Sequence, residues 1–589
     1  MLRLFISKNY GNYADTFLML GLARVVEYAL KVTNQKSGIQ LIDEGTRYCI
    51  QFKKSVNLEP IAKITYTSPF PVVKGQKTDI SKIPEEANIF NTVEHNEIRK
   101  VYREFMFQRG KRTEESPQPP DYRTQNGAIL TSMRHDRNHN DLWLVGWELR
   151  DYFGALIVAL CQGFSQENTT TELVAELFKA STGCKLPDAS AVKVYLPTSV
   201  QGVNRVKADS NKVDSQKTDW LSLWLIANGL FNFAVAERVK IAERVYDWRL
   251  VALQPQDISL SKYDDVLKQL LIHNLPGGGH GAARFDAELV IRFCQELLNH
   301  HRAANEQDDW DKPVNHFVSN FAGTHFGAKG QVYGVKEVFS LGLPAWVYPR
   351  NYNELLDYQN VLDEHLNVVR ALSLDEGHSE LIAAYRDFIT GNDLYQFFRF
   401  QVSYADYITK MAGANARVAL FSKQGLNLML KNLNNKYRQD DREWSLTEIT
   451  QDSGFLNIAK AINSATVYAG TIRDKDNQSK DTGWERIYGL AQRLISQSGS
   501  KKDFIIEIMS FLASYENENL RIDDELRKLK KPRRIWTTKD DLDRLINLID
   551  NHGSSLVANL LIAYGYAKGW GKAKDEKEQT EESLVECVN

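Results

Sequence analysis

The sequence lacks the features of secreted and membrane proteins. Its five cysteines are scattered singly and form no CxxC motif, which argues against a zinc ribbon or a disulfide framework and fits a reducing cytoplasm. Apolar stretches such as LVANLLIAYGYA fall short of the about 20 residues that cross a bilayer. The N-terminus shows no apolar core followed by a small-residue cleavage site, as a secretory signal would. We therefore expect a cytoplasmic chain with no membrane partner.

Signatures of nucleotide-binding and nucleophilic enzymes are also missing. There is no G-x-S-x-G elbow, and the glycine-rich stretch PGGGHGAAR lacks the Lys-Ser/Thr pair of a P-loop. That stretch is either an ordinary connection before a helix or a place where Gly277, Gly278 and Gly279 let the backbone approach DNA closely. Both readings stay open. We predict that the chain is not an enzyme and has no catalytic residue, metal or cofactor.

Patterns of apolar residues predict an α+β fold class. The first half mixes strand-like segments such as LRLFIS with helical ones such as ADTFLMLGLARVVEYAL. From about residue 350 helical spacing dominates, and Thr538 with Asp541 forms the pattern of a capping box. Two apolar stripes at helical spacing must each pack against another helix: Phe455, Ile458, Ala459 and Ile462, and Leu542, Leu545, Ile546 and Ile549.

Three regions follow from these patterns. We place a mixed α/β N-terminal region at 1–400, an all-α helical bundle at 401–573 and an acidic disordered tail at 574–589. Within the first region, the polar stretch 107–141 contains three prolines and is expected to be mostly loop.

The segment RHDRNHND concentrates side chains that suit three different roles. His135, Asp136, His139 and Asp141 could form the site of a metal-dependent nuclease or phosphohydrolase, but the further ligands are not identifiable, and a solvated loop is the better reading. Arginine pairs with guanine, and asparagine or glutamine with adenine. The composition therefore favours a third role, the reading of base edges in DNA, for Arg123, Gln125, Asn126, Arg134, Arg137, Asn138 and Asn140.

A basic run, RKLKKPRRIW, stands out in a chain whose 73 basic and 75 acidic residues nearly cancel. Pro532 ends the preceding helical pattern, so the charges fall on a helix end and the loop after it. Such a patch suits phosphates, because contacts with them release counterions and need no base sequence. The predicted contacts with the DNA backbone are Arg205, Lys207, Lys212 and Lys217 in a second polar loop, and Arg527, Lys528, Lys530, Lys531, Arg533 and Arg534 in the run.

Several phrases resemble a known family. They are ADTFLMLGLARVV near the N-terminus and, between residues 450 and 570, LNIAKAINSATVYAG, GWERIYGLAQRLISQ, KKDFIIEIMSFLASYENENLR and TKDDLDRLINLIDNHGSSLVANLLIAYGYAKG. The chain resembles the Cas-eight family, the large subunits of type I CRISPR surveillance complexes (Cascade), of the type I-B or Myxan-like kind. The middle of the chain diverges, and none of the shared phrases is catalytic.

The resemblance implies a non-catalytic DNA-binding subunit. Such subunits sit at the 5′ region of the guide RNA beside the other Cascade subunits, read a short protospacer-adjacent motif in double-stranded DNA, promote R-loop formation and hold the displaced single strand. The downstream partner would be a helicase-nuclease in defence systems or the transposition adaptor TniQ in CRISPR-associated transposons. Two alternatives remain at this point: the metal-dependent nuclease, and a purely structural helical adaptor.

Overall fold

The structure is a computed structural model of the whole chain. It describes residues 2–36, 38–65, 68–107, 116–166, 170–198, 217–272, 281–304, 311–329, 332–372, 377–433, 446–473, 479–529 and 534–570. No helix in these ranges is both long and apolar enough to span a bilayer. The predicted tail at 574–589 lies outside the described residues.

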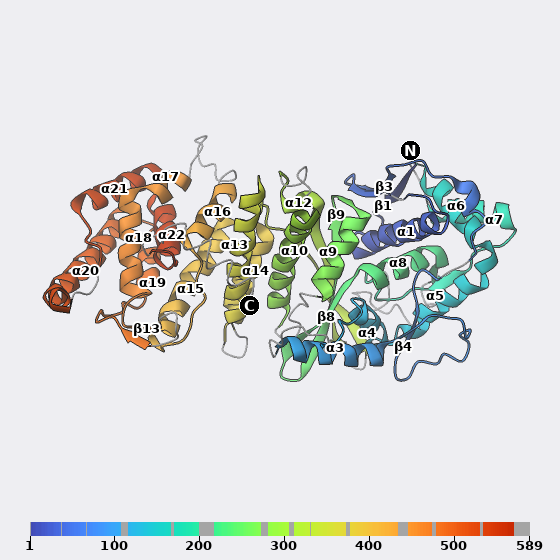
Figure 1. Cartoon of the computed structure of the whole chain (residues 1–589), viewed down its shortest axis with the longest axis horizontal. Coiled ribbons are helices and arrows are strands. Elements are labelled where there is room, and N and C mark those ends of the chain that lie inside the picture. Colours follow the sequence, from blue (N-terminus) through green and yellow to red (C-terminus); the bar gives the residue numbers. More distant parts are fainter. Residues whose placement is uncertain are drawn as a thin grey trace, which may run out of the picture. The chain divides into compact units, whose positions relative to one another are not determined.

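The chain divides into two compact units, residues 1–344 with 389–391, and residues 345–388 with 392–589. The first unit mixes helices and strands, and the second is almost wholly helical (Figure 1), so the predicted α+β fold class is confirmed. The expected boundary after residue 400 falls inside helix α15 (Leu394–Gly413), whereas the division lies just after β12 (Val332–Gly342). The helical spacing predicted from about residue 350 is confirmed, because α13 (Tyr352–Ala371) already belongs to the second unit and packs with the later helices.

A four-stranded antiparallel sheet opens the first unit, in the order β1-β3-β2-β10. Burial alternates along β1, with Leu4 and Ile6 turned inward, as expected for a strand with one face on a core. The predicted strand at LRLFIS and the helix after it are confirmed. The bounds are β1 Arg3–Ser7, α1 Tyr13–Val32, β2 Ile39–Asp43, β3 Arg47–Phe52 and β10 Asp257–Ser259.

Two buried helices form the centre of this unit. Every residue of α8 (Trp220–Phe233) is buried, and α8 lies along α1. Their backbones touch at two glycines, because a Cβ on Gly21 would overlap the carbonyl oxygen of Leu225, and one on Gly229 would overlap that of Phe17. Asn228 Nδ2 donates to the Gly21 carbonyl at 2.9 Å, which satisfies a polar group that has no access to water.

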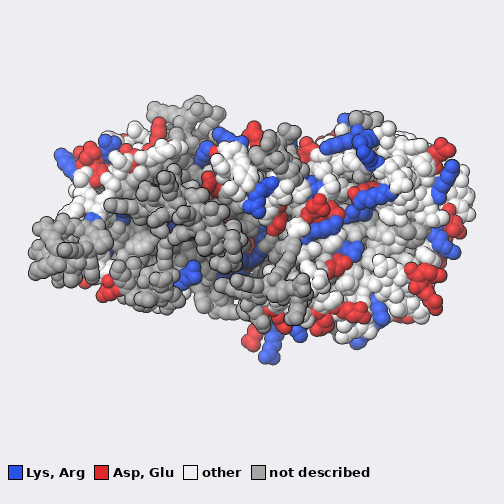
Figure 2. Space-filling model, in the orientation of Figure 1, with Lys and Arg blue, Asp and Glu red and all other residues white. Residues whose placement is uncertain are grey.

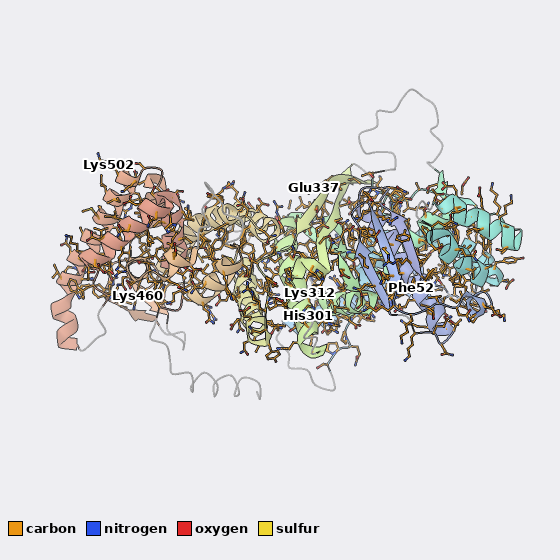
Figure 3. The ribbon with its side chains drawn as sticks, turned by 90° about the horizontal axis from the view of Figure 1, so that it is seen from above. Phe52, His301, Lys312, Glu337, Lys460 and Lys502 are labelled. Atoms are coloured by element: carbon orange, nitrogen blue, oxygen red, sulfur yellow. The ribbon has the colours of Figure 1, made fainter. Side chains whose placement is uncertain are left out.

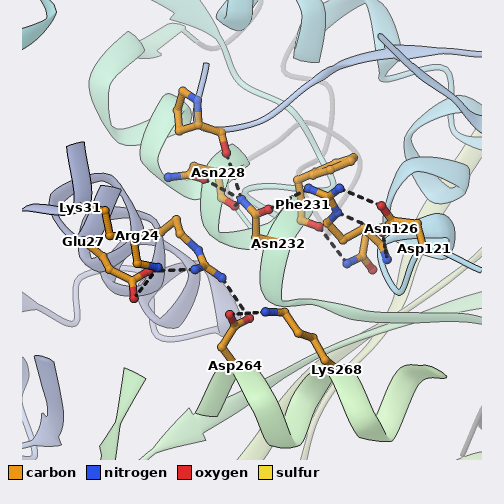
Figure 4. A network of polar contacts seen from close by, with 12 residues as sticks. Arg24, Glu27, Lys31, Asp121, Asn126, Asn228, Phe231, Asn232, Asp264 and Lys268 are labelled. Atoms are coloured by element: carbon orange, nitrogen blue, oxygen red, sulfur yellow. Dashed lines mark hydrogen bonds and ion pairs between the residues drawn. The ribbon is translucent and has the colours of Figure 1, made fainter. Parts of the chain in front are cut away.

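Ion pairs then tie α1 to α9 (Leu260–Ile272), as Figure 4 shows. Arg24 contacts Glu27 within its own helix and Asp264 of α9, both at 2.9 Å. Lys268 completes the set by contacting Asp264 at 2.7 Å. Asp264 therefore holds two cations that come from different helices.

A second antiparallel sheet has the order β12-β11-β9-β8. The strands are β8 Val235–Ala242, β9 Val245–Pro255, β11 Val318–Lys329 and β12 Val332–Gly342. Two glycines of β11 make room for side chains of the edge strand β12, since a Cβ on Gly323 would overlap Phe339 and one on Gly327 would overlap Lys336. Both side chains therefore cross β11 and reach β9.

The crossing side chains meet a buried charge network on β9. Lys336 Nζ lies 2.8 Å from Asp247 Oδ2, and the Phe339 ring covers the Arg249 guanidinium at 3.7 Å. Arg249 also forms a bidentate pair with Asp286 of α10 (Ala282–Ala304), at 2.8 and 2.6 Å. Glu337, labelled in Figure 3, lies 3.5 Å from Arg249 at the exposed side of the network.

The remaining elements of the first unit connect and cover these sheets. The helix expected after the glycine-rich stretch is α10. The other bounds are α2 Leu58–Ile61, β4 Val72–Lys74, β5 Ile89–Asn91, α3 Thr92–Phe107, α4 Thr124–Ser132, α5 Asp136–Glu148, η1 Arg150–Tyr152, α6 Phe153–Phe164, α7 Thr171–Thr182, β6 Asp188–Ser190, β7 Lys217–Asp219 and α12 Val314–Phe317.

The second unit is a bundle in which α18 (Ser453–Thr466) packs on α21 (Lys539–His552) and α22 (Ser554–Gly565). The predicted stripe from Phe455 to Ile462 is fully buried, and the capping box of Thr538 and Asp541 is confirmed. The other bounds are α14 Ser379–Gly391, α16 Lys423–Leu433, α17 Leu446–Gln451, β13 Thr471–Arg473, β14 Ser479–Asp481, α19 Leu490–Gln497 and α20 Lys501–Leu529.

Candidate nucleic-acid interface

A cleft of about 990 Å³ opens beside the N-terminal end of α5. It is lined from the loop 75–83, the start of α3 at 92–96, the end of α4 with the following turn at 131–137, and one face of α5 at 140–144. We call it the α5 cleft. Its charged side chains are the basic Lys77, Lys82, Arg134 and Arg137 and the acidic Asp79, Asp136 and Asp141.

Polar contacts fix the walls of the α5 cleft. The side-chain amide of Asn140 accepts from the backbone N–H of Val73 and donates to its carbonyl, both at 2.9 Å. Thr78 accepts from the backbone N–H of Gly75 at 2.8 Å and donates to the Asp136 carboxylate. Thr78 therefore holds the loop against the N-terminal end of α5, and Asn140 holds the preceding strand β4 against the same helix.

The acidic side chains of the cleft are partly engaged in these local bonds. Asp136 accepts from Thr78, and Asp79 accepts from the backbone N–H of Ser81 at 2.9 Å. The bonds from the Ser81 amide and hydroxyl lower the pKa of the exposed Asp79 carboxyl. Attraction to Lys82 and Arg137 lowers the same pKa further, so the Asp79 carboxylate also interacts with the basic side chains of the cleft.

The basic side chains, in contrast, are presented to solvent. Lys77, Lys82, Arg134 and Arg137 are all exposed, and none forms a salt bridge with another described residue. Arg134 has a φ of 59°, a left-handed conformation that favours glycine. It closes α4, where the N–H of His135 bonds back to the Leu130 carbonyl at 2.8 Å. An arginine therefore occupies a position at which the backbone prefers glycine, and its side chain lines the cleft.

The structure brings together three of the seven predicted base readers, Arg134, Arg137 and Asn140. Of these, Asn140 is buried, and its side-chain amide is hydrogen-bonded to the backbone of Val73. It therefore positions the chain before the loop and does not present an edge to a base. Asn138 lies on α5 but is not part of the cleft lining. Lys77 and Lys82 were missed from the sequence, although the lysines and the Asp-x-Ser turn in KGQKTDISK are the signal that could have found them.

Arg123, Gln125 and Asn126 lie elsewhere, because the stretch expected to be loop forms α4 and α5. Arg123 is paired with Asp121 at 2.8 and 3.0 Å and stacks over Phe231. Asn126 is 1% exposed and donates to the Phe231 carbonyl at 3.1 Å. Gln125 donates to Asn96 at 3.1 Å. In this structure these three side chains bond to other parts of the fold.

The four side chains of the metal-site alternative do not converge. Both ring nitrogens of His139 are engaged, since Nδ1 lies 2.6 Å from the Tyr195 hydroxyl and Nε2 3.0 Å from the Pro71 carbonyl. Asp136 is bound to Thr78, and Asp141 is exposed in the cleft. Within the described residues, no group of three or more His, Cys, Asp and Glu side chains has the geometry of a metal site.

The buried His139 makes the stability of the first unit sensitive to acid. Burial lowers its pKa from 6.5 to about 4, so the unfolded chain takes up the proton first as the pH falls. The free energy of unfolding is therefore highest, as far as His139 is concerned, above pH 6.5. It falls by roughly 3 kcal/mol as the pH drops from about 6.5 to 4. Urea unfolding at several pH values should show this loss, and His139→Gln should make the pH dependence shallower. An unchanged slope in the variant would contradict the assignment.

Most of the remaining predicted contacts cannot be placed. Gly277, Gly278, Gly279, Arg205, Lys207, Lys212, Lys530, Lys531 and Arg533 lie outside the described residues. Lys217 begins β7, and Arg527 and Lys528 lie in the last turn of α20, where only the backbone is described.

Arg534 is the member of the basic run whose side chain is described, and it is buried. Its guanidinium lies 3.9 Å from the Trp484 ring centroid and 5.4 Å from that of Tyr515, and Nη1 donates to Glu518 at 3.0 Å. Only 9% of the residue is exposed. The prediction of a backbone contact therefore does not fit Arg534, because its charge is already neutralised by Glu518 between two aromatic rings.

Replacing Arg534 with alanine should lower the free energy of unfolding by about 3 kcal/mol, since the half-buried Glu518 would keep only the exposed Arg521 as a cation and the guanidinium between the two rings would be lost. Arg521 is a matched control, because it also faces Glu518, at 3.7 Å, but with a side chain that is 57% exposed. Arg521→Ala should cost less than about 1 kcal/mol. Chemical denaturation of both variants checks this, and equal losses would contradict the burial of Arg534.

Charge on the rest of the visible surface is mixed. Figure 2 shows basic and acidic side chains interspersed over the described parts of one face. The basic side chains of the α5 cleft are thus distinguished by their shared concavity, and not by a large field.

A scan of the chain against protein-family models and a search of the curated proteins found no match. The function is therefore inferred from the residues of the chain and from the resemblance of its short phrases to the Cas-eight family. Among the described residues, the α5 cleft is the place where several of the predicted side chains meet.

Proposed function

We propose that the chain is the non-catalytic, DNA-binding large subunit of an RNA-guided type I CRISPR complex, and that the α5 cleft contacts nucleic acid. The observation that carries the proposal is the set of four exposed basic side chains, without salt bridges to described residues, on the walls of one cleft of about 990 Å³. Nucleic acid is a polyanion, and each lysine or arginine that neutralises a phosphate releases a bound counterion.

The surroundings of these side chains also suit phosphates. The cleft contains the N-terminal end of α5, where free backbone N–H groups and the helix dipole favour an anion. The walls are held by Asn140 and Thr78, so the basic side chains start from a fixed backbone. Fixed walls reduce the conformational entropy that is lost when a ligand binds.

The division of the chain is compatible with the resemblance. A mixed α/β unit is followed by a helical unit, and the phrases most similar to the family fall in helices α18 to α22 of the second unit. As implied by the resemblance, the partners would be the 5′ region of the guide RNA, the other Cascade subunits, target duplex and displaced strand, and a helicase-nuclease or TniQ. The proposed setting is the cytoplasm.

Salt-dependent binding of labelled DNA by the full chain tests the proposal. The double variant Lys82→Ala, Arg137→Ala should bind about tenfold more weakly and reduce the slope of log affinity against log salt by about 2, one for each lost phosphate contact. The control Lys54→Ala, Lys185→Ala removes the same charge from exposed positions outside the cleft.

An unchanged affinity and slope in the cleft variant would overturn the proposed contact. The same experiment addresses the structural adaptor, for which DNA binding would not depend on these residues. It also addresses the nuclease, because cleavage of the labelled DNA would be seen directly.

A further inference from the structure

The shape of the α5 cleft bears on which form of nucleic acid it takes. Duplex DNA carries its base edges on the floor of its grooves, so proteins read them with a protruding element, such as a helix in the major groove of about 12 Å width. In the α5 cleft the basic side chains lie on the walls of a hollow. A hollow of about 990 Å³ has the size of a pocket for a small ligand, which is closer to the size of a few unpaired nucleotides than to that of a duplex.

The remaining lining side chains are suited to unpaired nucleotides. Val93, Ile83 and Leu144 give apolar surface that can contact the face of a base, and Gln76 offers an exposed amide to its edge. Among the residues that the structure describes, no aromatic side chain lines this cleft, so stacking on a base would fall to the planar guanidinium groups of Arg134 and Arg137. Proteins that bind single strands combine these elements, a basic groove and planar groups for the bases.

The backbone conformation of Arg134 fixes the point from which its side chain extends. Its left-handed backbone is held by the bond from His135 to Leu130, so the side chain leaves the chain at a set point of the cleft rim. A glycine would relieve the backbone but could not supply a guanidinium. The observation therefore favours a ligand that is bound by the side chain itself.

From these observations we infer that the α5 cleft binds an unpaired segment of nucleic acid in preference to a duplex. This inference rests on the proposed function and goes further by assigning a strand form to the cleft. The phosphates contact Lys77, Lys82 and the two arginines, and the bases contact the apolar wall that contains Val93. Unpaired DNA and unpaired RNA share this chemistry.

A charge placed on the apolar wall gives a sharp test. Val93 is 39% exposed in the first turn of α3, where a glutamate is favourable to the helix, so Val93→Glu should fold normally. Ile98→Glu is the matched control, because Ile98 is 45% exposed on the same helix but does not line the cleft. Circular dichroism of both variants confirms that the fold is kept.

Fluorescence anisotropy of the full chain is measured with a mixed-sequence 12-nucleotide DNA strand, the same sequence as RNA, and the corresponding duplex. We expect Val93→Glu to weaken binding of at least one single strand about tenfold, with duplex binding unchanged and Ile98→Glu without effect. The DNA and RNA arms show which strand is the ligand.

Two results overturn the inference, and they are distinguishable. If Val93→Glu and the variant Lys82→Ala, Arg137→Ala weaken duplex and single strands equally, the preference for unpaired nucleotides is wrong, but nucleic-acid binding at the cleft stands. If neither variant changes the affinity for any of the three probes, the cleft is not a nucleic-acid site and the proposed contact fails as well.

Discussion

Replacing Gly229 with alanine is expected to abolish folding of the first unit. The glycine lies in the middle of α8, where the helix crosses α1, and a Cβ at this position would overlap the carbonyl oxygen and carbonyl carbon of Phe17. The atoms in the way belong to a backbone, which cannot turn aside as a side chain can. Both helices are buried and pack closely, so the helices must separate and lose contacts along their length.

Thermal and urea unfolding, with the yield of folded protein, checks this expectation. We expect a loss of more than about 4 kcal/mol, which belongs to the largest class of single substitutions. Gly391→Ala is the control, because no atom lies within 4 Å of a Cβ at this position at the end of α14. This control should be neutral or slightly stabilising. A folded Gly229→Ala variant of normal stability would show that the two helices do not touch at this point.

Replacing Arg134 with glycine should raise stability while it lowers affinity for nucleic acid. The left-handed backbone conformation at Arg134 is about 1 kcal/mol less favourable for a residue with a side chain than for glycine. The guanidinium that lines the cleft is lost in the same step, so the salt slope of DNA binding should fall by about 1. Opposite signs for the two effects are not expected of a residue that only supports the fold.

Arg244 provides a matched control for this experiment. It has a φ of 60° and a side chain that is 92% exposed, and it lies in a hairpin turn outside the cleft. Arg244→Gly should give a similar gain in stability with unchanged DNA affinity. If Arg134→Gly and Arg244→Gly behave alike in binding, Arg134 has no part in the proposed contact.

Local patterns of the sequence predicted much of the fold. The strand at LRLFIS, the helix after it and the stripe from Phe455 to Ile462 depend on residues close in the chain, and all are confirmed. The capping box of Thr538 and Asp541 is confirmed for the same reason. The contacts that stabilise these features join residues three or four positions apart, so the spacing of residue types in the sequence is enough to predict them.

Helix α4 was missed because distant residues stabilise it. Its polar and glycine-containing sequence favours a turn, but the Asn126 amide bonds to the Phe231 carbonyl, 105 positions further along the chain. Tertiary contacts of this kind override local propensity. The same misreading placed Asn126 and Gln125 among exposed base readers, although both are buried.

The candidate site was predicted only in part, for a similar reason. Arg134 and Arg137 were found because their residue types are suited to nucleic acid. Lys77 and Lys82 were not, because the loop that carries them meets α5 through the bond between Val73 and Asn140, which spans 67 positions. The spacing of residues along the chain does not reveal that this loop and α5 lie close together.

The two glycines of β11 have a consequence for the free edge of their sheet. Strand β12 is 11 residues long and borders the sheet, so its outer backbone groups could recruit another strand. A slide of β12 by one residue would set Lys336 and Phe339 against strand positions that bear side chains, and would take Lys336 away from Asp247 and the Phe339 ring away from Arg249. Mispairing at this edge, including exchange between molecules, is thereby penalised by steric overlap and by the loss of these two contacts.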